Sequence, residues 1–309
     1  MGWRCTGLRW GDGVPVLGWC RGGEVRGSAQ VYGTEFGFRA VGERGCVGAR
    51  GNVCPVGAVV PGRSTGARCP ECARLDRAHS VAADTIADDP RTYRVYLAWF
   101  GPGMVKVGIT AEERGAARLR EQGAVVFSWL GRGPLMACRR TEEVLRAALG
   151  VPDRIPYARK RAVRGALPGA AERAGEVAGL YGRAVALEGG GGWPESLERL
   201  PFEAVDHVVL FGLGDGDGVG EGGGAGGAGG GGGAGGVRWA VTELVAGGVV
   251  GGRLVAAAGP DLHLATTGGV VVLDTRLMTG WELVAADARG GVGVPVVDLG
   301  GGGVQGGLF

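Results

Sequence analysis

Four cysteines between residues 46 and 72 place the strongest constraint on what this chain can fold into. Their spacing is Cys46-x7-Cys54-x14-Cys69-x2-Cys72. Two residues between Cys69 and Cys72 let both thiolates reach one tetrahedral ion, at about 2.3 Å from each sulfur. The surrounding segment is glycine-rich and polar and cannot build an apolar core, so a bound metal would supply the missing cohesion. We therefore expect a structural Zn²⁺ site formed by these four cysteines.

Other interpretations of the cysteines stay open at this point. A disulfide framework is disfavoured in the cytoplasm, where thiols are kept reduced. A redox-active Cys-x-x-Cys motif needs a βαβ context, which the surrounding sequence does not offer. His79, seven residues after Cys72, is an alternative ligand. The isolated Cys5, Cys20 and Cys138 are expected to be ordinary core or half-buried residues.

We expect neither a secretory signal nor a membrane span in this chain. Its first residues, MGWRCTGLRWGDG, contain no apolar stretch of the kind that a signal peptide requires. The longest apolar candidate, residues 237–254, is interrupted by Arg238 and Glu243, so it does not reach the uncharged length that crosses a bilayer. We expect a cytoplasmic protein without a membrane partner.

The alternation of strand, helix and low-complexity patterns predicts an α+β fold. An Asp12-Gly13 turn between apolar residues predicts an N-terminal hairpin. The apolar stretch 207–212 predicts a strand, and the glycine-rich stretch after it is a linker rather than a dinucleotide-binding loop, because no amphipathic helix follows. Beyond the linker we expect a meander or small barrel of short strands. The six expected segments are a β-rich N-terminal part (1–45), the cysteine element and a connector (46–90), an α/β core (91–165), a helical extension and strand (166–211), the linker (212–236) and a β-rich C-terminal domain (237–309).

The central core alternates strands and helices. Residues 94–110 predict two strands joined by a glycine turn, and residues 124–131 a third strand. A helix between them should end at Gly123. A second helix should begin at Thr141 as its N-cap and end at Gly150, and residues 170–187 predict a further helix.

Positive charge is concentrated in the same core. Between Arg91 and Arg164 there are 15 Lys and Arg against 6 Asp and Glu, a net charge of +9 in a chain whose total is +2. Such a module suggests an anionic partner, nucleic acid first among them. The alternative is a solvated arginine face. The residues expected to contact phosphates are Arg132, Arg159, Lys160, Arg161 and Arg164.

The core resembles the GIY-YIG nuclease domain, a small three-stranded sheet with flanking helices whose first two strands carry the two halves of the motif. Arg94-Val95-Tyr96 stands where Gly-Ile-Tyr would be, and Lys106-Val107-Gly108 where Tyr-Ile-Gly would be. Arg118, just before a leucine on the next helix, matches the family's arginine. Glu142, three residues before Leu145, matches its glutamate.

The layout of nearly the whole chain also resembles an uncharacterised bacterial family, a domain of unknown function. The shared features are the four-cysteine element, HSVAADT (His79 to Thr85), KVGIT, RGPLMA (Arg132 to Ala137) and LMTGWEL near the end. This resemblance brings no established activity.

The nuclease resemblance implies a role for each of four residues. Tyr96 would activate water, Lys106 and Arg118 would handle the phosphate, and Glu142 would hold one Mg²⁺ or Mn²⁺ ion. Lys106 departs from the family, because an ammonium donates hydrogen bonds but cannot accept a proton as a tyrosine hydroxyl can. Only two of the 33 Lys and Arg residues of the chain are lysines. The presence of a lysine instead of an arginine at position 106 therefore favours a specific role for Lys106. The alternative without a catalytic role is that Lys106 is a charge at the edge of a strand and Tyr96 is a core aromatic residue.

Such a site requires the four side chains to converge on one pocket. Tyr96 and Lys106 must point to the same face of the sheet, and the turn between the strands sets that phase. The expected function is a zinc-containing protein that binds or processes nucleic acid, with a divalent-metal-dependent phosphodiester nuclease site. The alternatives are an inactive nucleic-acid-binding module and a zinc-stabilised scaffold for protein partners.

Overall fold

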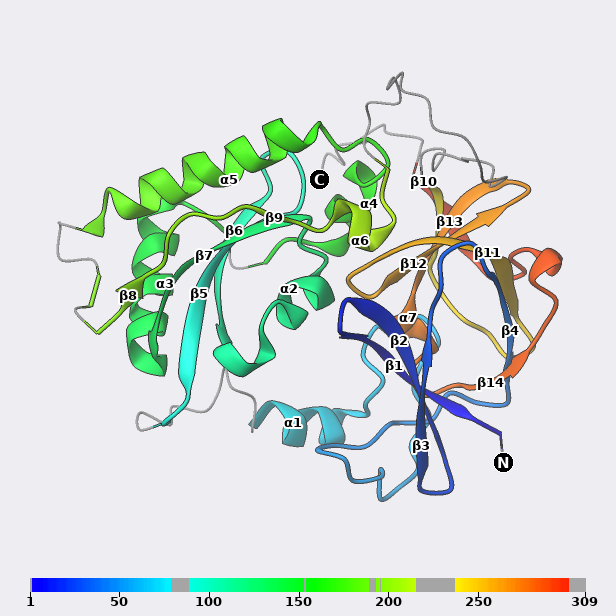
Figure 1. The fold of residues 1–309 in the computed structure, drawn as a ribbon. Helices are drawn as coiled ribbons and strands as arrows, with labels where there is room; N and C mark the ends of the chain where they lie inside the picture. Colours follow the sequence, from blue (N-terminus) through cyan, green and yellow to red (C-terminus); the bar gives the residue numbers. More distant parts are fainter. Residues whose placement is uncertain are drawn as a thin grey trace, which may run out of the picture. The chain divides into compact units, whose positions relative to one another are not determined.

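The computed structural model of the 309-residue chain describes residues 2–78, 89–152, 154–188, 193–194, 196–214 and 237–299 (Figure 1). The chain divides into two compact units. One contains Met1–Arg9, Pro15–His79 and Ala234–Phe309, and the other contains Trp10–Val14 and Ser80–Gly233. Most of the expected glycine-rich linker and the stretch His79–Thr85 lie outside the described residues.

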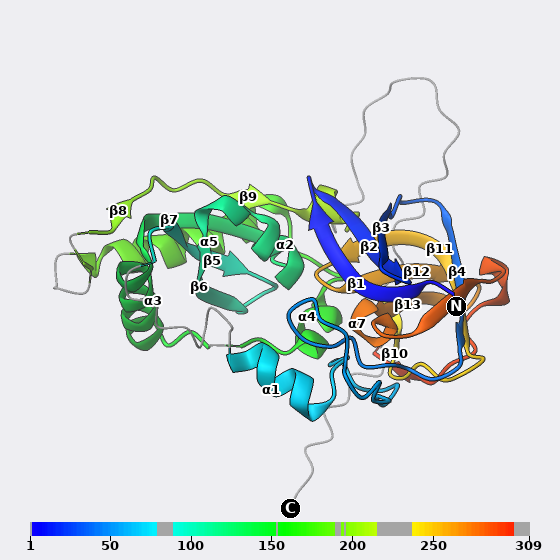
Figure 2. The same ribbon diagram turned by 90° about the horizontal axis from the view of Figure 1, so that it is seen from below.

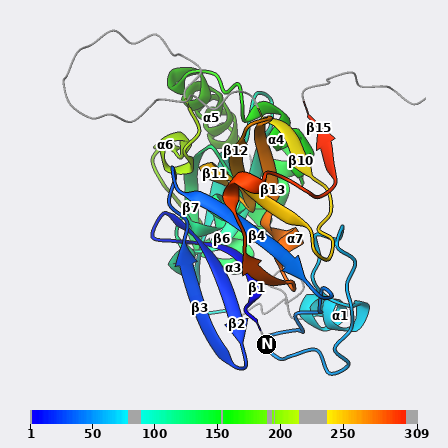
Figure 3. The ribbon, with the colours of Figure 1, turned by 90° about the vertical axis from the view of Figure 1, so that its right-hand side faces the viewer.

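A ten-stranded sheet forms the first unit, in the order β15-β10-β13-β12-β11-β4-β14-β1-β2-β3 (Figure 3). Its strands are β1 (Arg4–Gly11), β2 (Val14–Arg21), β3 (Glu24–Ala29), β4 (Glu35–Val41), β10 (Val237–Val241), β11 (Val249–Ala258), β12 (Asp261–Thr266), β13 (Gly269–Asp274), β14 (Glu282–Ala285) and β15 (Val296–Asp298). The expected N-terminal hairpin is present, with positive φ at both Asp12 and Gly13. The expected meander is β11, β12 and β13.

The two β-rich ends of the chain are one structure rather than two. Strand β4 pairs with β11 on one side and with β14 on the other, both antiparallel. The N-terminal strands thus complete a sheet whose other members come from the last part of the chain. This unit also contains the helices α1 (Pro70–Ala78) and α7 (Thr275–Met278) and the short 3₁₀ helix Ala288–Gly290.

The second unit has a smaller sheet, ordered β6-β5-β7-β8, with β9 also pairing with β7 (Figure 2). The three long strands are β5 (Thr92–Trp99), β6 (Val105–Ala111) and β7 (Val126–Pro134), all antiparallel to their neighbours. Two-residue strands, β8 (Glu198–Arg199) and β9 (Val205–Asp206), extend the sheet because the later chain runs along the open edge of β7. The sheet therefore has five strands instead of the three expected, while the predicted mixed α+β class is confirmed.

The helices of this unit differ from expectation in three places. The first predicted helix is split at Gly115 into a 3₁₀ turn (Glu112–Arg114) and α2 (Ala117–Gln122), which ends at Gly123 in the left-handed conformation. Helix α3 (Leu135–Leu149) starts directly after β7, so Thr141 lies inside it and its hydroxyl donates to the carbonyl oxygen of Ala137 at 2.9 Å. The expected strand at 207–212 is a single helical turn, α6 (Val208–Phe211). The helix predicted at 170–187 is confirmed as α5 (Ala170–Val185), and α4 spans Tyr157–Val163.

One buried histidine links the core to the end of α2. His207 is 3 % exposed, and its Nδ1 lies 2.9 Å from the carbonyl oxygen of Ala124. The ring packs against Phe127 and Phe211. Burial lowers the pKa of His207 below its ordinary value, although the contact with Ala124 opposes this shift. The folded protein therefore holds His207 neutral under conditions in which the unfolded chain would take up a proton.

Stability should consequently fall as the pH falls below about 6.5, the ordinary histidine pKa. The slope for one proton is at most about 1.4 kcal/mol per pH unit. His207→Gln should flatten this dependence, whatever its effect on stability near neutral pH. Urea unfolding at about pH 7.5 and about pH 5.5 measures the difference. Identical pH dependence in wild type and variant would contradict the assignment.

Candidate functional site

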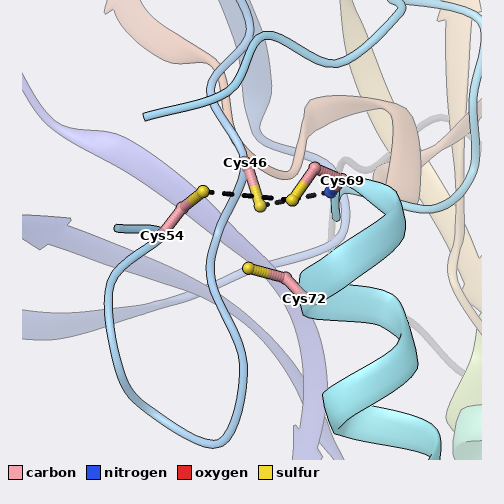
Figure 4. A group of neighbouring side chains, drawn as sticks. All are labelled: Cys46, Cys54, Cys69 and Cys72. Atoms are coloured by element: carbon pink, nitrogen blue, oxygen red, sulfur yellow. Dashed lines mark hydrogen bonds between the residues drawn. The ribbon is translucent and has the colours of Figure 1, made fainter. Parts of the chain in front are cut away.

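The four predicted cysteines lie together in the first unit (Figure 4). Their sulfur atoms all lie within 4.8 Å of one another, and those of Cys54 and Cys69 are 4.0 Å apart. Four sulfurs around a tetrahedral ion lie about 3.8 Å apart when each metal–sulfur bond is about 2.3 Å. The cysteines are therefore positioned to hold one metal ion. No other Cys, His, Asp and Glu group of three or more in the described residues has this arrangement, and His79 lies outside them.

The local backbone turns its N–H groups toward these sulfurs. Gly48 and Cys69 donate from their backbone nitrogens to the Cys46 sulfur at 3.4 and 3.2 Å. Gly48 has φ +76°, and a Cβ there would overlap the carbonyl of Asn52, so the turn requires glycine. Cys69 directly precedes α1 and Cys72 lies in its first turn, so both belong to the start of that helix.

The pKa values of two of the cysteine thiols shift in opposite directions. Hydrogen bonding, first from the backbone of Ala58, lowers the pKa of Cys54 to about 6. Burial, followed by the neighbouring thiols, raises the pKa of Cys72 to about 12. The cluster thus accommodates a first negative charge readily and resists further ones. A cation at the centre would remove that resistance, which is the condition under which four thiolates coexist.

The cysteines themselves make up much of this element's interior. Cys46, Cys69 and Cys72 are buried together with Ala49 and Val60. All seven cysteines of the chain are free thiols. A donor set of four sulfurs is one that zinc and iron–sulfur centres prefer over magnesium or calcium.

A buried arginine ties the same element to the rest of its unit. Arg44 is 1 % exposed and donates to four backbone carbonyl oxygens at 2.6 to 2.8 Å. Two of them, Pro61 and Ser64, belong to the cysteine-bearing loop, and the other two, Arg276 and Thr279, belong to α7 and the residue that follows it. The Arg44 side chain therefore ties the cysteine-bearing loop to α7.

A second candidate site is a cavity of about 630 Å³ in the second unit. All four residues expected to form an active site line it: Tyr96 from β5, Lys106 from β6, Arg118 from α2 and Glu142 from α3. In the β5–β6 register, Ala98 lies opposite Lys106 and Tyr96 opposite Gly108. Because directly opposed residues share a face, Tyr96 and Lys106 point to the same side of the sheet.

Tyr96 lies almost entirely within the protein, with 2 % of its surface exposed. A Cβ on Gly108 would overlap the Tyr96 phenol, so glycine at this position lets the ring lie across the neighbouring strand. Burial raises the pKa of Tyr96, hydrogen bonding by Gln122 and the charge of Arg118 oppose the rise, and Glu142 adds to it. The phenol is therefore neutral near neutral pH.

Gln122, which the sequence did not single out, connects the site residues. Its amide Nε2 donates to the Tyr96 hydroxyl oxygen at 2.8 Å, and its Oε1 accepts from the Lys106 ammonium at 3.3 Å. The chain's other lysine, Lys160, donates to the backbone oxygen of the same residue at 2.9 Å. Both lysines of an arginine-rich chain thus converge on Gln122. A cation on Oε1 fixes the orientation of the amide, which leaves Nε2 toward Tyr96.

The lining of the cavity carries more positive than negative side chains. Its cations are Arg91, Lys106, Arg114, Arg118 and Arg139, against the carboxylates of Glu113 and Glu142. Arg114 is held by Glu121 through two bonds of 2.8 and 2.9 Å. Arg118 lies farther from Glu121, at 3.8 Å, and its side chain is 46 % exposed. The cavity therefore suits an anionic group.

Three residues at the start of β5 form a polar network at the cavity that the sequence did not indicate. The Tyr93 hydroxyl donates to Asp89 at 2.7 Å and accepts from Arg91 at 2.8 Å, and Arg91 also pairs with Asp89 at 2.6 Å. The hydrogen bonds from Arg91, followed by that from Tyr93, hold the pKa of Asp89 well below its ordinary range. The one sequence signal for this network is the close spacing of Asp89, Arg91 and Tyr93 at alternate positions.

The expected phosphate-binding residues are only partly accessible. Lys160 and Arg164 are 4 % and 3 % exposed, and the Lys160 ammonium lies 3.8 Å from the centre of the Phe100 ring. Arg159 is exposed and Arg161 half-buried. Arg132 forms an ion pair with Glu198 at 2.8 Å. A phosphate approaching α4 would therefore meet Arg159 and Arg161 rather than Lys160 and Arg164.

None of the helices in the described part of the chain has the length and hydropathy that a membrane crossing requires.

Comparison with known proteins gives one match. No curated protein and no solved structure matches the chain. A family model described as a protein of unknown function, DUF2797, matches residues 33–213, which include the four cysteines and every residue expected at the cavity. Since the match spans more than half of the sequence, the chain belongs to the DUF2797 family.

Proposed function

We propose that this protein is a divalent-metal-dependent phosphodiester nuclease with a GIY-YIG-like site in its second unit and a structural zinc in its first. The observation that carries the proposal is the meeting of Tyr96, Lys106, Arg118 and Glu142 in one cavity. These residues come from four different elements and were assigned by position in a motif, so their convergence supports the shared site. The GIY-YIG-like core and the nucleic-acid partner are both part of this proposal.

The cations of the cavity would bind the phosphodiester. The ammonium of Lys106 and the guanidinium of Arg118 place positive charge where the non-bridging oxygens of a phosphate would lie. Arg118 suits this role because its nearest carboxylate, Glu121, is 3.8 Å away and its side chain remains accessible. Lys106 adds a compact point charge on a strand, where it is more confined than on a loop.

Tyr96 would orient rather than deprotonate the attacking water. Its raised pKa keeps the phenol protonated, so it serves as a neutral hydrogen-bonding group. Because Gln122 donates to the phenol oxygen, the hydroxyl hydrogen points elsewhere and can be donated to a ligand. Gln122 is thus a positioning residue that couples Tyr96 to Lys106.

Glu142 would hold the divalent ion of the proposed reaction. Magnesium is bound by one or two carboxylates together with substrate phosphates and water, and a single half-buried glutamate in a cationic cavity fits that pattern. When bound, the ion would supply Lewis-acid stabilisation of the leaving oxygen.

In the first unit the four cysteines would hold zinc in a purely structural role. Four protein sulfurs would fill all four positions of a tetrahedral ion, which would leave no open position for a substrate.

The proposal predicts that purified protein cleaves labelled nucleic acid in the presence of Mg²⁺ or Mn²⁺. Single-stranded, duplex and branched substrates should be compared. Glu142→Gln should reduce cleavage by roughly 100-fold or more, the scale expected for losing a group that stabilises charge in the transition state. Glu143→Gln is the matched control, since Glu143 is the exposed next residue of the same helix and does not line the cavity.

A second function is favoured by Lys106 and by the neutral Tyr96. Both features remove proton-accepting capacity from the site and leave its positive charge. An inactive nucleic-acid-binding module would bind these substrates, with Arg118→Gln weakening the complex, but would cleave none of them with either metal. Absence of both binding and cleavage would overturn both functions.

A further inference from the structure

A second cavity, of about 530 Å³, lies in the first unit and has four aromatic side chains among the described residues that line it. Trp3, Trp19, Phe36 and Phe38 line it, together with Arg26 and several polar side chains. Trp19 and Arg26 are directly opposite each other on β2 and β3, so they project from the same face of the sheet. Trp3, Trp19 and Phe36 are only half-buried, which leaves ring surface within reach of a ligand.

The orientation of the aromatic wall is fixed by hydrogen bonds. The Trp19 indole N–H donates to the Ser28 hydroxyl at 2.9 Å, and the Gln30 amide donates to the same oxygen at 3.1 Å. Because Ser28 accepts twice, its own hydrogen is available to a ligand. The Trp19 ring therefore offers an apolar face whose polar edge is already satisfied.

Arg26 is the one cation in the described lining of the cavity, opposite in sign to the one carboxylate there, Glu35. Its guanidinium stacks over the Trp3 ring at 3.9 Å from the ring centre. Among the described residues it forms no ion pair, whereas Arg21, also over Trp3 at 4.6 Å, pairs with Glu24 at 3.1 Å. A guanidinium over an indole face keeps N–H donors at its rim, which can bind an oxyanion. It would repel the quaternary ammonium ligands that aromatic cages otherwise take.

We propose that this cavity binds a nucleobase by stacking, with the attached phosphate on Arg26. A flat aromatic group matches the Trp19 and Phe36 faces, and base–aromatic stacking of this kind is tolerant of sequence. The Ser28 hydroxyl and the Glu35 carboxylate supply one donor and one acceptor for the edge of the base. The base is either part of an unpaired strand or a free nucleotide. The proposal goes beyond cleavage at the Tyr96 cavity and does not depend on it.

The test is fluorescence polarisation of a short labelled single-stranded DNA, without added divalent metal so that no cleavage occurs. Arg26→Gln and Trp19→Leu should each weaken binding by about tenfold, the scale of one stacked base or one charged contact. Trp19→Phe should retain most of the affinity and serves as the folded counterpart of Trp19→Leu. Arg21→Gln is the matched control, since Arg21 also stacks on Trp3 but does not line the cavity.

Three competitors separate the possible ligands. An unlabelled duplex should compete poorly, because its bases are already stacked. If AMP competes as strongly as the unlabelled single strand at equal concentration of binding sites, the ligand is a free nucleotide. If AMP competes weakly, the ligand is an unpaired strand. Tetramethylammonium competing in place of either would overturn the proposal.

The Lys106→Met background keeps this result separate from the proposed nuclease. Binding that survives Lys106→Met and is lost with Arg26→Gln supports the aromatic cavity even if no substrate is ever cut. Binding that is lost only with Lys106→Met, and is unchanged by Arg26→Gln and Trp19→Leu, overturns it and leaves the nuclease proposal intact.

Discussion

One zinc ion per chain should purify with the protein, and replacing Cys69 and Cys72 together with serine should remove it. Few of the apolar residues between Cys46 and Cys72 are buried, and the buried cluster of this element consists mainly of the ligands. Metal binding is then folding free energy, on the order of 10 kcal/mol for structural zinc sites in small domains. Loss of the ion should release this element, and Arg44 would lose two of its four carbonyl acceptors there.

Elemental analysis of freshly reduced protein gives the stoichiometry, and thermal unfolding gives the cost of losing the site. Cys20→Ser is the control, because Cys20 is half-buried and lies outside the cluster. It should leave both the metal content and the unfolding temperature close to those of wild type. Reduced wild-type protein that contains no metal would contradict the assignment.

The cysteine site was predictable because it depends mainly on local chemistry. The spacing of Cys69 and Cys72 lets both sulfurs reach one ion, and this did not depend on predicting the helix α1, which was not expected there. The longer gaps to Cys46 and Cys54 required only that a loop return, and Gly48 with its positive φ makes such a return possible. The two pKa directions within the cluster were not predictable, since they depend on which backbone amides reach which sulfur.

The errors in the fold come from tertiary contacts that override local pattern. Residues 208–211 are all apolar and begin with two β-branched valines, yet they form a helical turn capped at Gly212 in the left-handed conformation. Thr141 is a good N-cap by type, but the helix begins at Leu135 because β7 ends at a proline there. The pairing of β4 with β11 joins residues more than 200 positions apart, and no local pattern encodes such a partner.

At the cavity, too, some features could be predicted from a sequence motif and others depend on tertiary contacts. The four residues predicted from their positions in the GIY-YIG motif line one cavity: Tyr96, Lys106, Arg118 and Glu142. The phase of the turn between β5 and β6 decided whether Tyr96 and Lys106 share a face, and only the register revealed it. Gln122 carries no sequence signal, because a glutamine before a helix-ending glycine is common. Its role follows from the three side chains that meet it in space.

Lys106→Met should reduce the affinity of the second unit for a phosphodiester on the order of 100-fold, with turnover lost to at least the same extent. Methionine keeps the length and the apolar stem of lysine but removes its charge and its hydrogen bond to Gln122. A hydrogen bond from a charged donor contributes about 1.5 to 3 kcal/mol, which is consistent with that loss. The fold should persist, because Lys106 is half-buried on β6 and its strand pairing is made by the backbone.

Two further variants at this position separate charge from proton chemistry. Lys106→Arg keeps the charge, so it should retain much of the binding, with a penalty for fitting a planar guanidinium in place of a compact ammonium. Lys106→Tyr restores the residue of the GIY-YIG motif and adds a hydroxyl that both donates and accepts. If the site lacks only a proton acceptor, Lys106→Tyr should cleave faster than wild type while binding more weakly. Wild-type binding and cleavage in Lys106→Met would show instead that Lys106 is a surface charge of β6, and the convergence on Gln122 would then be structural, serving to close α2 against the sheet.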